Sequence, residues 1–180
     1  MFHVTERLLL RPAWPEDADA LFGGIADEGV VRNLASAPWP YLPKHADEFV
    51  MRDAHPFYPR FLITFPTPEG SEIVGCVGID PSESGKTELG YWIARAHWGR
   101  GFASEAAQGM LEVARLLGHQ SIEAGHFIDN PASGKVLRKI GFVPTGKVVP
   151  RHSRGRGAEA PCALYRLVLT GCTAVPSMAA

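Results

Sequence analysis

The stretch W-G-R-G-F-A-S-E-A, residues 98–106, places two glycines one residue apart, directly before a segment of high helix propensity. The apolar run T-E-L-G-Y-W-I-A, residues 87–94, precedes it and predicts a strand. A helix start presents unpaired N–H groups and the positive end of the helix dipole, and glycine lets a large anion approach them. We therefore expect an anion-binding site at this strand-to-helix junction, with Arg100 adding positive charge.

Several kinds of anion site use a glycine-rich junction. A P-loop needs G-x-x-x-x-G-K-[ST], but the single G-K-T of the chain, residues 85–87, has Asp80 at the place of the first glycine. A dinucleotide fingerprint, G-x-G-x-x-G, matches at Gly99 and Gly101 but has Ser104 at its third place. The P-loop is excluded and the dinucleotide site is disfavoured. An acyl-coenzyme A cradle and a structural turn without a ligand are the other two hypotheses.

The rest of the chain alternates predicted strands and helices, which is typical of a mixed α/β domain. Strands are predicted over residues 4–12, 60–65, 71–79, 87–94, 121–127, 143–149 and 162–170. Helices are predicted over residues 15–27, 44–54, 103–117 and 131–140. Short turns between the middle strands predict an antiparallel meander. We expect one domain over residues 1–170 and a flexible tail over residues 171–180.

Composition and charge limit the classes of partner. With 180 residues, 46% apolar content and a formal net charge of -1, the chain can bury a sizeable core and has no excess of positive charge for DNA or acidic membranes. The three cysteines form no C-x-x-C pair and the seven histidines form no H-E-x-x-H motif, so no metal site is predicted. No apolar run approaches the roughly 18 residues of a membrane span. We expect a cytoplasmic protein with neither DNA nor membrane partners.

The junction resembles motif A of the GNAT N-acetyltransferase superfamily, Q/R-x-x-G-x-G/A followed by a long helix. Gly101 and Ala103 match this motif, whereas Trp98 stands in place of its first Gln or Arg. Further stretches in the same order resemble the RimJ/RimL-like branch, which acetylates ribosomal-protein N-termini: TERLLLRP (5–12), PWPY (38–41), ELGYWIA (88–94) and NPASGKVLRKIGF (130–142). The resemblance covers residues 4–170.

The resemblance implies a mostly antiparallel, twisted sheet of about seven strands with about four helices. Its fourth and fifth strands, residues 87–94 and 121–127, would splay apart and admit the pantetheine arm of acetyl-CoA. The arm would meet the main chain of Ile93 and Ala94. The pyrophosphate would lie on the junction residues Gly99, Arg100, Gly101, Phe102, Ala103 and Ser104. Asn130 and Ser133 would approach the thioester.

The implied reaction is direct attack of an amine on the acetyl thioester, through an oxyanion that a strand N–H can stabilise. Glu88 resembles the fourth-strand glutamate that serves relatives as general base; its alternative role is a solvated carboxylate. Many relatives protonate the leaving thiolate with a tyrosine, and Leu137 stands at the matching place. We expect Ser133 to take over this task, with helix capping as its alternative role.

The acceptor site is expected to involve Trp39, Tyr41 and His126, for which packing within the fold is the alternative. The segment RHSRGRG, residues 151–157, would border this site, either to select an acidic acceptor or as a solvated connecting loop. The overall prediction is an acetyl-CoA-dependent N-acetyltransferase acting on a primary amine, of a protein N-terminus or of a small molecule. The alternatives are a non-catalytic acyl-CoA-binding domain, favoured by the missing tyrosine, and a nucleotide-binding domain. A homodimer is compatible with each.

Overall fold

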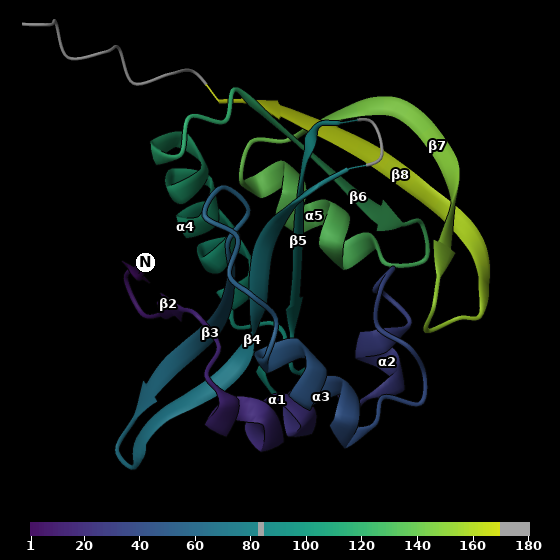
Figure 1. Ribbon diagram of the computed structural model, residues 1–180. Helices are drawn as coiled ribbons and strands as arrows, with labels where there is room; N and C mark the ends of the chain where they lie inside the picture. Colours follow the sequence, from purple (N-terminus) through teal and green to yellow (C-terminus); the bar gives the residue numbers. More distant parts are fainter. Residues whose placement is uncertain (83–84, 170–180) are drawn as a thin grey trace, which may run out of the picture.

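The computed structural model describes residues 1–82 and 85–169, which share one eight-stranded sheet in the order β1-β2-β3-β4-β5-β6-β8-β7 (Figure 1). The strands are β1 His3–Val4, β2 Leu9–Arg11, β3 Arg60–Thr67, β4 Gly70–Pro81, β5 Thr87–Ile93, β6 Ser121–Phe127, β7 Val143–Ser153 and β8 Ala158–Val168. Neighbours are antiparallel except for the parallel pair β5 and β6. The predicted mixed sheet is confirmed. It has one more strand than predicted because the first segment forms two short strands. The predicted tail, residues 171–180, lies outside the described residues.

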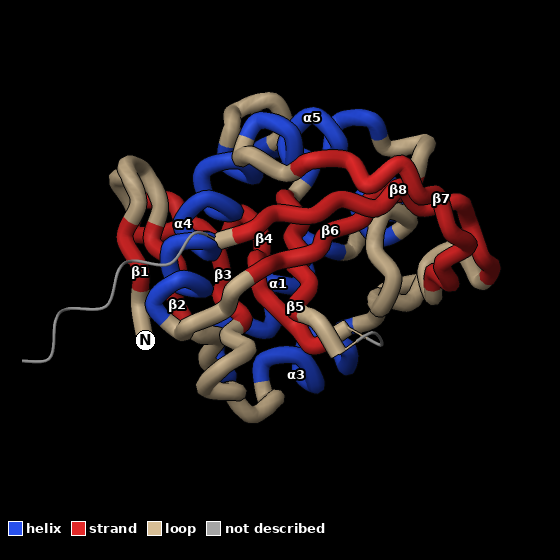
Figure 2. Tube along the Cα trace, turned by 90° about the horizontal axis from the view of Figure 1, so that it is seen from above, coloured by secondary structure: helices blue, strands red, loops and turns tan. Residues whose placement is uncertain are grey.

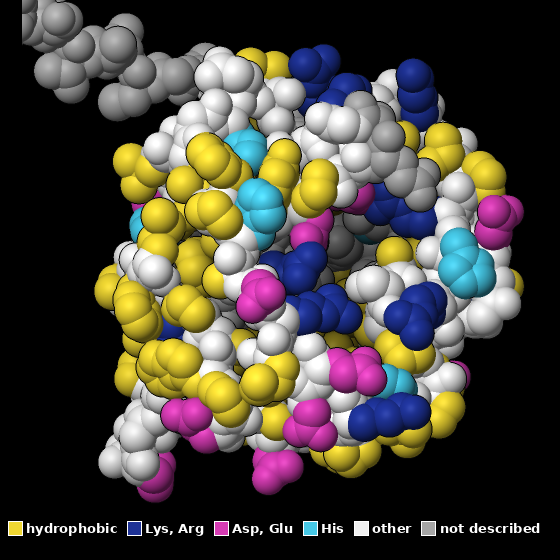
Figure 3. Space-filling model, viewed as in Figure 1, with side chains coloured by type: hydrophobic (Ala, Val, Ile, Leu, Met, Phe, Trp, Pro, Cys, Tyr) yellow, Lys and Arg dark blue, Asp and Glu magenta, His cyan; other side chains and the backbone are white. Residues whose placement is uncertain are grey.

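Helices cover both faces of the sheet. They are α1 Ala18–Ile25, α2 Glu28–Val31, α3 Pro43–Val50, α4 Phe102–Leu116 and α5 Pro131–Lys139, with short 3-10 turns at Pro15–Asp17 and Arg95–His97. Figures 1 and 2 show α1 and α3 on one face and α4 and α5 on the other. The face with α1 and α3 is hollowed near its centre, between charged side chains (Figure 3). No helix of residues 1–82 or 85–169 is long and apolar enough to cross a membrane.

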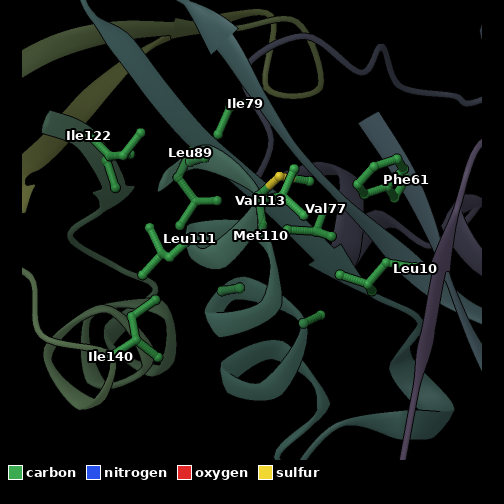
Figure 4. Close-up of a cluster of buried hydrophobic side chains, with 14 of the residues drawn as sticks. Leu10, Phe61, Val77, Ile79, Leu89, Met110, Leu111, Val113, Ile122 and Ile140 are labelled. Atoms are coloured by element: carbon green, nitrogen blue, oxygen red, sulfur yellow. The ribbon is translucent and has the colours of Figure 1, made fainter. Parts of the chain in front are cut away.

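A hydrophobic core between the sheet and α4 fixes the position of that helix. One side of α4 carries an apolar stripe that is buried, and Figure 4 shows Met110 and Leu111 of the helix among strand side chains such as Val77 and Leu89. Burying a side chain of this size stabilises the fold by about 1.5–3 kcal/mol. The first turn of α4 is therefore held firmly at the end of β5.

The gap that the resemblance implies is present between β5 and β6. These strands pair at only two positions, Thr87 with Ile122 and Glu88 with Glu123. Beyond them β5 continues its pairing with β4, whereas β6 pairs with β8 along its whole length. Within the described residues, the remainder of β5 therefore has no strand partner on the side of β6. The predicted splay between the fourth and fifth predicted strands is confirmed.

Two segments far apart in sequence are tied together at the start of α4. Glu105 accepts hydrogen bonds from Thr5 Oγ1 at 2.6 Å, from the Arg7 main-chain N at 2.7 Å and from Arg7 Nε at 2.8 Å. Arg7 Nη1 also donates to the Arg100 carbonyl at 3.2 Å. Burial acts to raise the pKa of Glu105, but these hydrogen bonds and the Arg7 charge outweigh it and lower the pKa. The connection between β1 and β2 thus braces the glycine junction.

The segment 151–157 differs from the predicted connecting loop. Its first half belongs to β7, and only residues 154–157 form the turn to β8. The sequence did not reveal this strand because its exposed charged residues conceal the strand pattern. Ser153 is fully buried, and its Oγ donates to the Leu34 carbonyl at 2.7 Å. The Arg154 N–H donates to the Ala35 carbonyl at 2.9 Å. The β7–β8 hairpin is therefore fastened to the chain between α2 and α3.

A buried ion pair links β2 to the turn before α1. Arg11 Nη1 and Nη2 each donate to a carboxylate oxygen of Asp17 at 2.7 Å, and the Trp14 N–H donates to the same carboxylate at 2.7 Å. Burial acts to raise the pKa of Asp17, but the Arg11 and Trp14 hydrogen bonds outweigh it and lower the pKa. A group with a lowered folded-state pKa stabilises the fold above its unfolded pKa, and this stability is lost as the pH falls through the folded pKa.

We predict that Asp17→Asn lowers the free energy of unfolding at pH 7 by about 3 kcal/mol, because Arg11 is left as an uncompensated buried charge. The difference between wild type and variant should shrink as the pH falls through the lowered folded-state pKa of Asp17, because the wild-type carboxylate then also becomes protonated. Urea unfolding at a series of pH values measures both effects. A difference that stays constant as the pH falls through this pKa would contradict the assignment.

Candidate active site

A cavity of about 1020 Å³ opens where β5 leaves β6. Its size is in the range of small-molecule and cofactor sites. The structure brings many of the predicted site residues together in its lining: Tyr41, Glu88, Ile93, Gly99, Gly101, Phe102, Ala103, Ser104, His126, Asn130 and Ser133. The lining does not include Trp39, Ala94 or Arg100.

The glycine junction forms one wall of this cavity. Gly99 and Gly101 have φ angles of +77° and +82°, in the left-handed region that favours glycine, and they let the chain turn from β5 into α4. The first intrahelical bond is donated by the Glu105 N–H to the Gly101 carbonyl at 3.1 Å. The N–H groups of residues 102–104 precede this bond and, as in any first helical turn, lack partners within the helix. They make the junction suitable for an anion.

Arg100 stands behind this wall instead of within it. Its guanidinium lies over the rings of Phe65 and Phe102, at 4.8 and 4.6 Å from their centroids, and its Nη1 is 3.0 Å from His97 Nδ1. His97 Nε2 in turn lies 3.0 Å from a carboxylate oxygen of Glu72. Arg100 adds positive charge near the first turn of α4 but does not reach the cavity in this arrangement.

The end of β5 presents its main chain to two different neighbours. The Ala94 N–H donates to the Val74 carbonyl of β4 at 2.9 Å, so this donor is used within the sheet. Main-chain groups alternate between the two edges of a strand, so those of Ile93 point toward the gap. The Ile93 carbonyl accepts the Trp98 indole N–H at 2.7 Å. Trp98, the residue that departs from the family motif, thus fixes the turn between strand and junction.

A pair of hydroxyl groups connects β5 to α5. Tyr91 Oη lies 2.8 Å from Ser133 Oγ, and Asn130 Oδ1 accepts the Ser133 N–H at 3.4 Å as the cap of α5. Burial raises the pKa of Tyr91 to about 12, so its hydroxyl is protonated at neutral pH. Tyr91 lines the cavity but was missed from sequence. Strand alternation, which places it on the same face as Leu89, was the signal that could have found it.

Glu88 occupies the opposite face of the sheet and forms an ion pair with Arg151 of β7. Both terminal nitrogens of the Arg151 guanidinium take part. Nη1 donates to Glu88 Oε1, and Nη2 donates to Glu88 Oε2 at 3.2 Å. Both side chains line the cavity. Arg151 was predicted only as part of a charged segment, because no local pattern reveals a contact between strands 63 residues apart in the chain.

The three residues predicted to contact the acceptor lie in different places. Tyr41 is 7% exposed in the core beneath α1 and α3, and burial raises its pKa to about 12. His126 lies on the α5 side, with Nε2 at 3.4 Å from Tyr165 Oη. Trp39 is 41% exposed and outside the cavity lining. The structure therefore brings Tyr41 and His126 to the cavity from opposite faces of the sheet and leaves Trp39 outside it.

The polar groups of the cavity suit anion binding and proton transfer. Within residues 1–82 and 85–169 there is no group of three or more His, Cys, Asp or Glu side chains placed to hold a metal ion. Cys76 and Cys162 line the cavity, but burial raises the pKa of both thiols, that of Cys76 to about 12, which disfavours the reactive thiolate. The arrangement combines helix N–H donors, a free strand edge, a carboxylate and two hydroxyls.

Comparison with known proteins identifies the family of the chain. An uncharacterized N-acetyltransferase, p20, from Bacillus licheniformis is 33% identical over 148 residues, which cover 79% of this chain and 82% of p20. A GNAT-family acetyltransferase structure from Bacillus anthracis superposes with a TM-score of 0.79 at 22% identity, covering 93% of this chain and 98% of that one. The ribosomal L7/L12 α-N-protein acetyltransferase RimL, solved with coenzyme A, gives a TM-score of 0.74 at 18% identity over 94% and 98% of the two chains.

The protein-family model for the acetyltransferase (GNAT) domain matches residues 7–143 of this chain, which include β2 to β6, the glycine junction and α5. The chain belongs to the GNAT acetyltransferase family.

Proposed function

We propose that this protein is an acetyl-CoA-dependent N-acetyltransferase that transfers an acetyl group to a primary amine. The observation that carries the proposal is one cavity that joins the first turn of α4 to the unpaired edge of β5. Such a cavity offers donors for a pyrophosphate at one end and main-chain partners for a pantetheine arm along the strand. RimL, a solved neighbour of similar fold, contains coenzyme A.

The proposed cofactor site assigns a role to each wall of the cavity. The N–H groups of residues 102–104 would hold the pyrophosphate, and Gly99 and Gly101 leave room for it to approach. The edge of β5 at Ile93 would hold the pantetheine arm. Acetyl-CoA supplies the activated acetyl thioester, and the chain supplies its orientation and the proton transfers.

The proposed chemistry forms one bond and breaks one. The amine nitrogen bonds to the acetyl carbon and the carbon–sulfur bond breaks, while a β5 N–H stabilises the oxyanion. Glu88 accepts a proton from the amine, and Ser133, hydrogen-bonded to the protonated Tyr91, donates one to the leaving thiolate. Afterwards Glu88 releases its proton to solvent and Ser133 regains one from solvent. The α-amine of a polypeptide terminus, with a reference pKa of about 7.7–8.0 against about 10.4 for lysine, would need less help from the base than a lysine amine.

The finer assignments belong to the same proposal. The order of motifs supports a RimJ/RimL-like enzyme whose acceptor is a protein N-terminus or a small-molecule amine. Cys76 and Cys162 are buried free thiols, which suits the reducing conditions of the cytoplasm. The competing function is a GNAT domain that binds acyl-CoA without catalysis. It is favoured by Leu137, which is 1% exposed in the core where many relatives have tyrosine.

The test is a calorimetric titration with acetyl-CoA, followed by detection of free thiol during incubation with a panel of primary amines. We predict saturable binding of acetyl-CoA and amine-dependent release of thiol. In Ser133→Ala, binding should persist while the rate of release falls by about 10²-fold, the usual contribution of a positioned proton donor. Binding without thiol release for any amine would support the non-catalytic domain. Failure to bind acetyl-CoA, or binding of NAD or ATP in its place, would refute the proposal.

Binding of the amine acceptor on the face of the sheet that carries Glu88 can be tested through a glycine with ordinary backbone geometry. A Cβ added to Gly90 meets no heavy atom within 4 Å, and Gly90 lines the cavity on the same face as Glu88. We predict that Gly90→Leu leaves the melting temperature and acetyl-CoA affinity unchanged but raises the KM for the amine by about tenfold or more. Gly23→Leu, which also enters open space but lies outside the cavity lining, is the matched control. Equal amine kinetics in the two variants would argue against acceptor binding on this face.

A further inference from the structure

We propose that the amine acceptor is a small zwitterion of the α-amino acid class, whose carboxylate binds Arg151 and whose amino group binds Glu88. This inference rests on the proposed function and names the acceptor class for the same cavity. It comes from the ion pair between Arg151 and Glu88, which lies on the face of the sheet opposite Tyr91. The proposed chemistry uses Glu88 as a base but gives the pair no role in selecting the acceptor.

The ion pair has the partial burial that a binding site requires. The side chains of Arg151 and Glu88 are 31% and 23% exposed, and both line the cavity. Glu88 begins the part of β5 that leaves β6, so the pair lies at the narrow end of the gap. An acceptor that reaches the thioester from this face must pass these two charges.

Charge balance favours an acceptor that carries both signs. Asp80 is the direct neighbour of Glu88 on β4, and Asp80 is itself paired with Arg60, whose Nε lies 3.0 Å from its Oδ1. The row Arg60, Asp80, Glu88 and Arg151 therefore contains two positive and two negative charges. A simple ammonium ion that displaced Arg151 from Glu88 would neutralise Glu88 but would break this partly buried ion pair without replacing the carboxylate on the Arg151 side, and breaking such a pair is costly. An amino acid compensates both groups at once.

The geometry limits the spacing between the two charges of the acceptor. Arg151 and Glu88 are in direct contact, so an ammonium and a carboxylate that replace this contact must themselves be separated by a short spacer. Gly90 of β5, which lies opposite Gly78 of β4, provides space beside the pair, whereas a Cβ added to Gly78 would lie 2.9 Å from Arg60 Cγ. Both line the cavity, and the position above Gly90 is open to at least 4 Å.

A bridge across this side of the cavity favours a free amino acid over a polypeptide terminus. The β7–β8 hairpin is fastened to the chain between α2 and α3 by the bonds from Ser153 and Arg154, and Arg156 Nε donates to the Arg32 carbonyl at 2.6 Å. The contact is tight, because a Cβ added to Gly155 would lie 2.6 Å from a Val31 methyl group. Leu34, Ala35 and Arg154 of this bridge line the same cavity as the ion pair, so we expect a compact zwitterion to reach the pair more readily than a polypeptide terminus does.

The experiment compares matched substrates on one enzyme preparation. For several side chains, the free amino acid, its primary amide and the decarboxylated amine are each assayed for thiol release from acetyl-CoA, and kcat/KM is measured. We expect the free acid to exceed the amide by about tenfold or more, since truncating one partner of a desolvated charge pair has effects of this size. The long ω-amino acid 6-aminohexanoate should resemble the amide. The acid-to-amide ratio is independent of the fraction of folded enzyme.

Arg151→Gln should reduce the acid-to-amide ratio of kcat/KM to about one. Without the Arg151 guanidinium, the carboxylate of the free acid loses the partner that distinguished it from the amide. Lys147→Gln removes one positive charge from an exposed position of the same strand and should leave the ratio unchanged. Thiol release without a preference for the free acid, a peptide amide that outperforms amino acids, or a ratio unaffected by Arg151→Gln would overturn this inference and leave the proposed function standing. Binding of acetyl-CoA without acetylation of any amine would overturn both.

Discussion

The structure depends on a backbone constraint in the middle of its sheet. β5 and β6 separate after two residue pairs, and the separation leaves the main-chain donors and acceptors of β5 without a strand partner on that side in the described residues. Interior peptide groups need hydrogen-bonding partners, and a sheet that keeps such an edge must satisfy it with water or with a ligand. The cavity at this place is the direct consequence, and the candidate functional groups are arranged around it.

Rigid elements hold this open edge in place. On one face, the apolar stripe of α4 is buried against β4 and β5, and Glu105 and Arg7 tie the first turn of the helix to the amino-terminal strands. On the other face, the β7–β8 hairpin is fastened to the segment between α2 and α3. A site built on braced helices and strands keeps its groups in register without a bound ligand. The two glycines with positive φ complete it, because other residues would strain the turn.

The sequence was sufficient to predict the features that depend on local pattern or on motif order. Residues 87–106 predicted the strand, the junction and the helix, and the family motifs predicted the splay that the register of β5 and β6 confirms. It did not reveal α2, whose four residues are too short for a helical period. The contact of Arg151 with Glu88 was also missed, because it joins strands that meet only in the folded sheet. Tyr91 could have been predicted from strand alternation, but its approach to Ser133 depends on where α5 packs.

In the proposed function, coenzyme A occupies the gap between β5 and β6 and the start of α4. Amide hydrogen exchange with and without coenzyme A tests it directly, because each backbone N–H reports its own protection. We expect slower exchange in the presence of coenzyme A at Tyr91, Ile93 and residues 102–104, with little change along α3. Saturable binding that protects other segments and leaves these amides unchanged would contradict it.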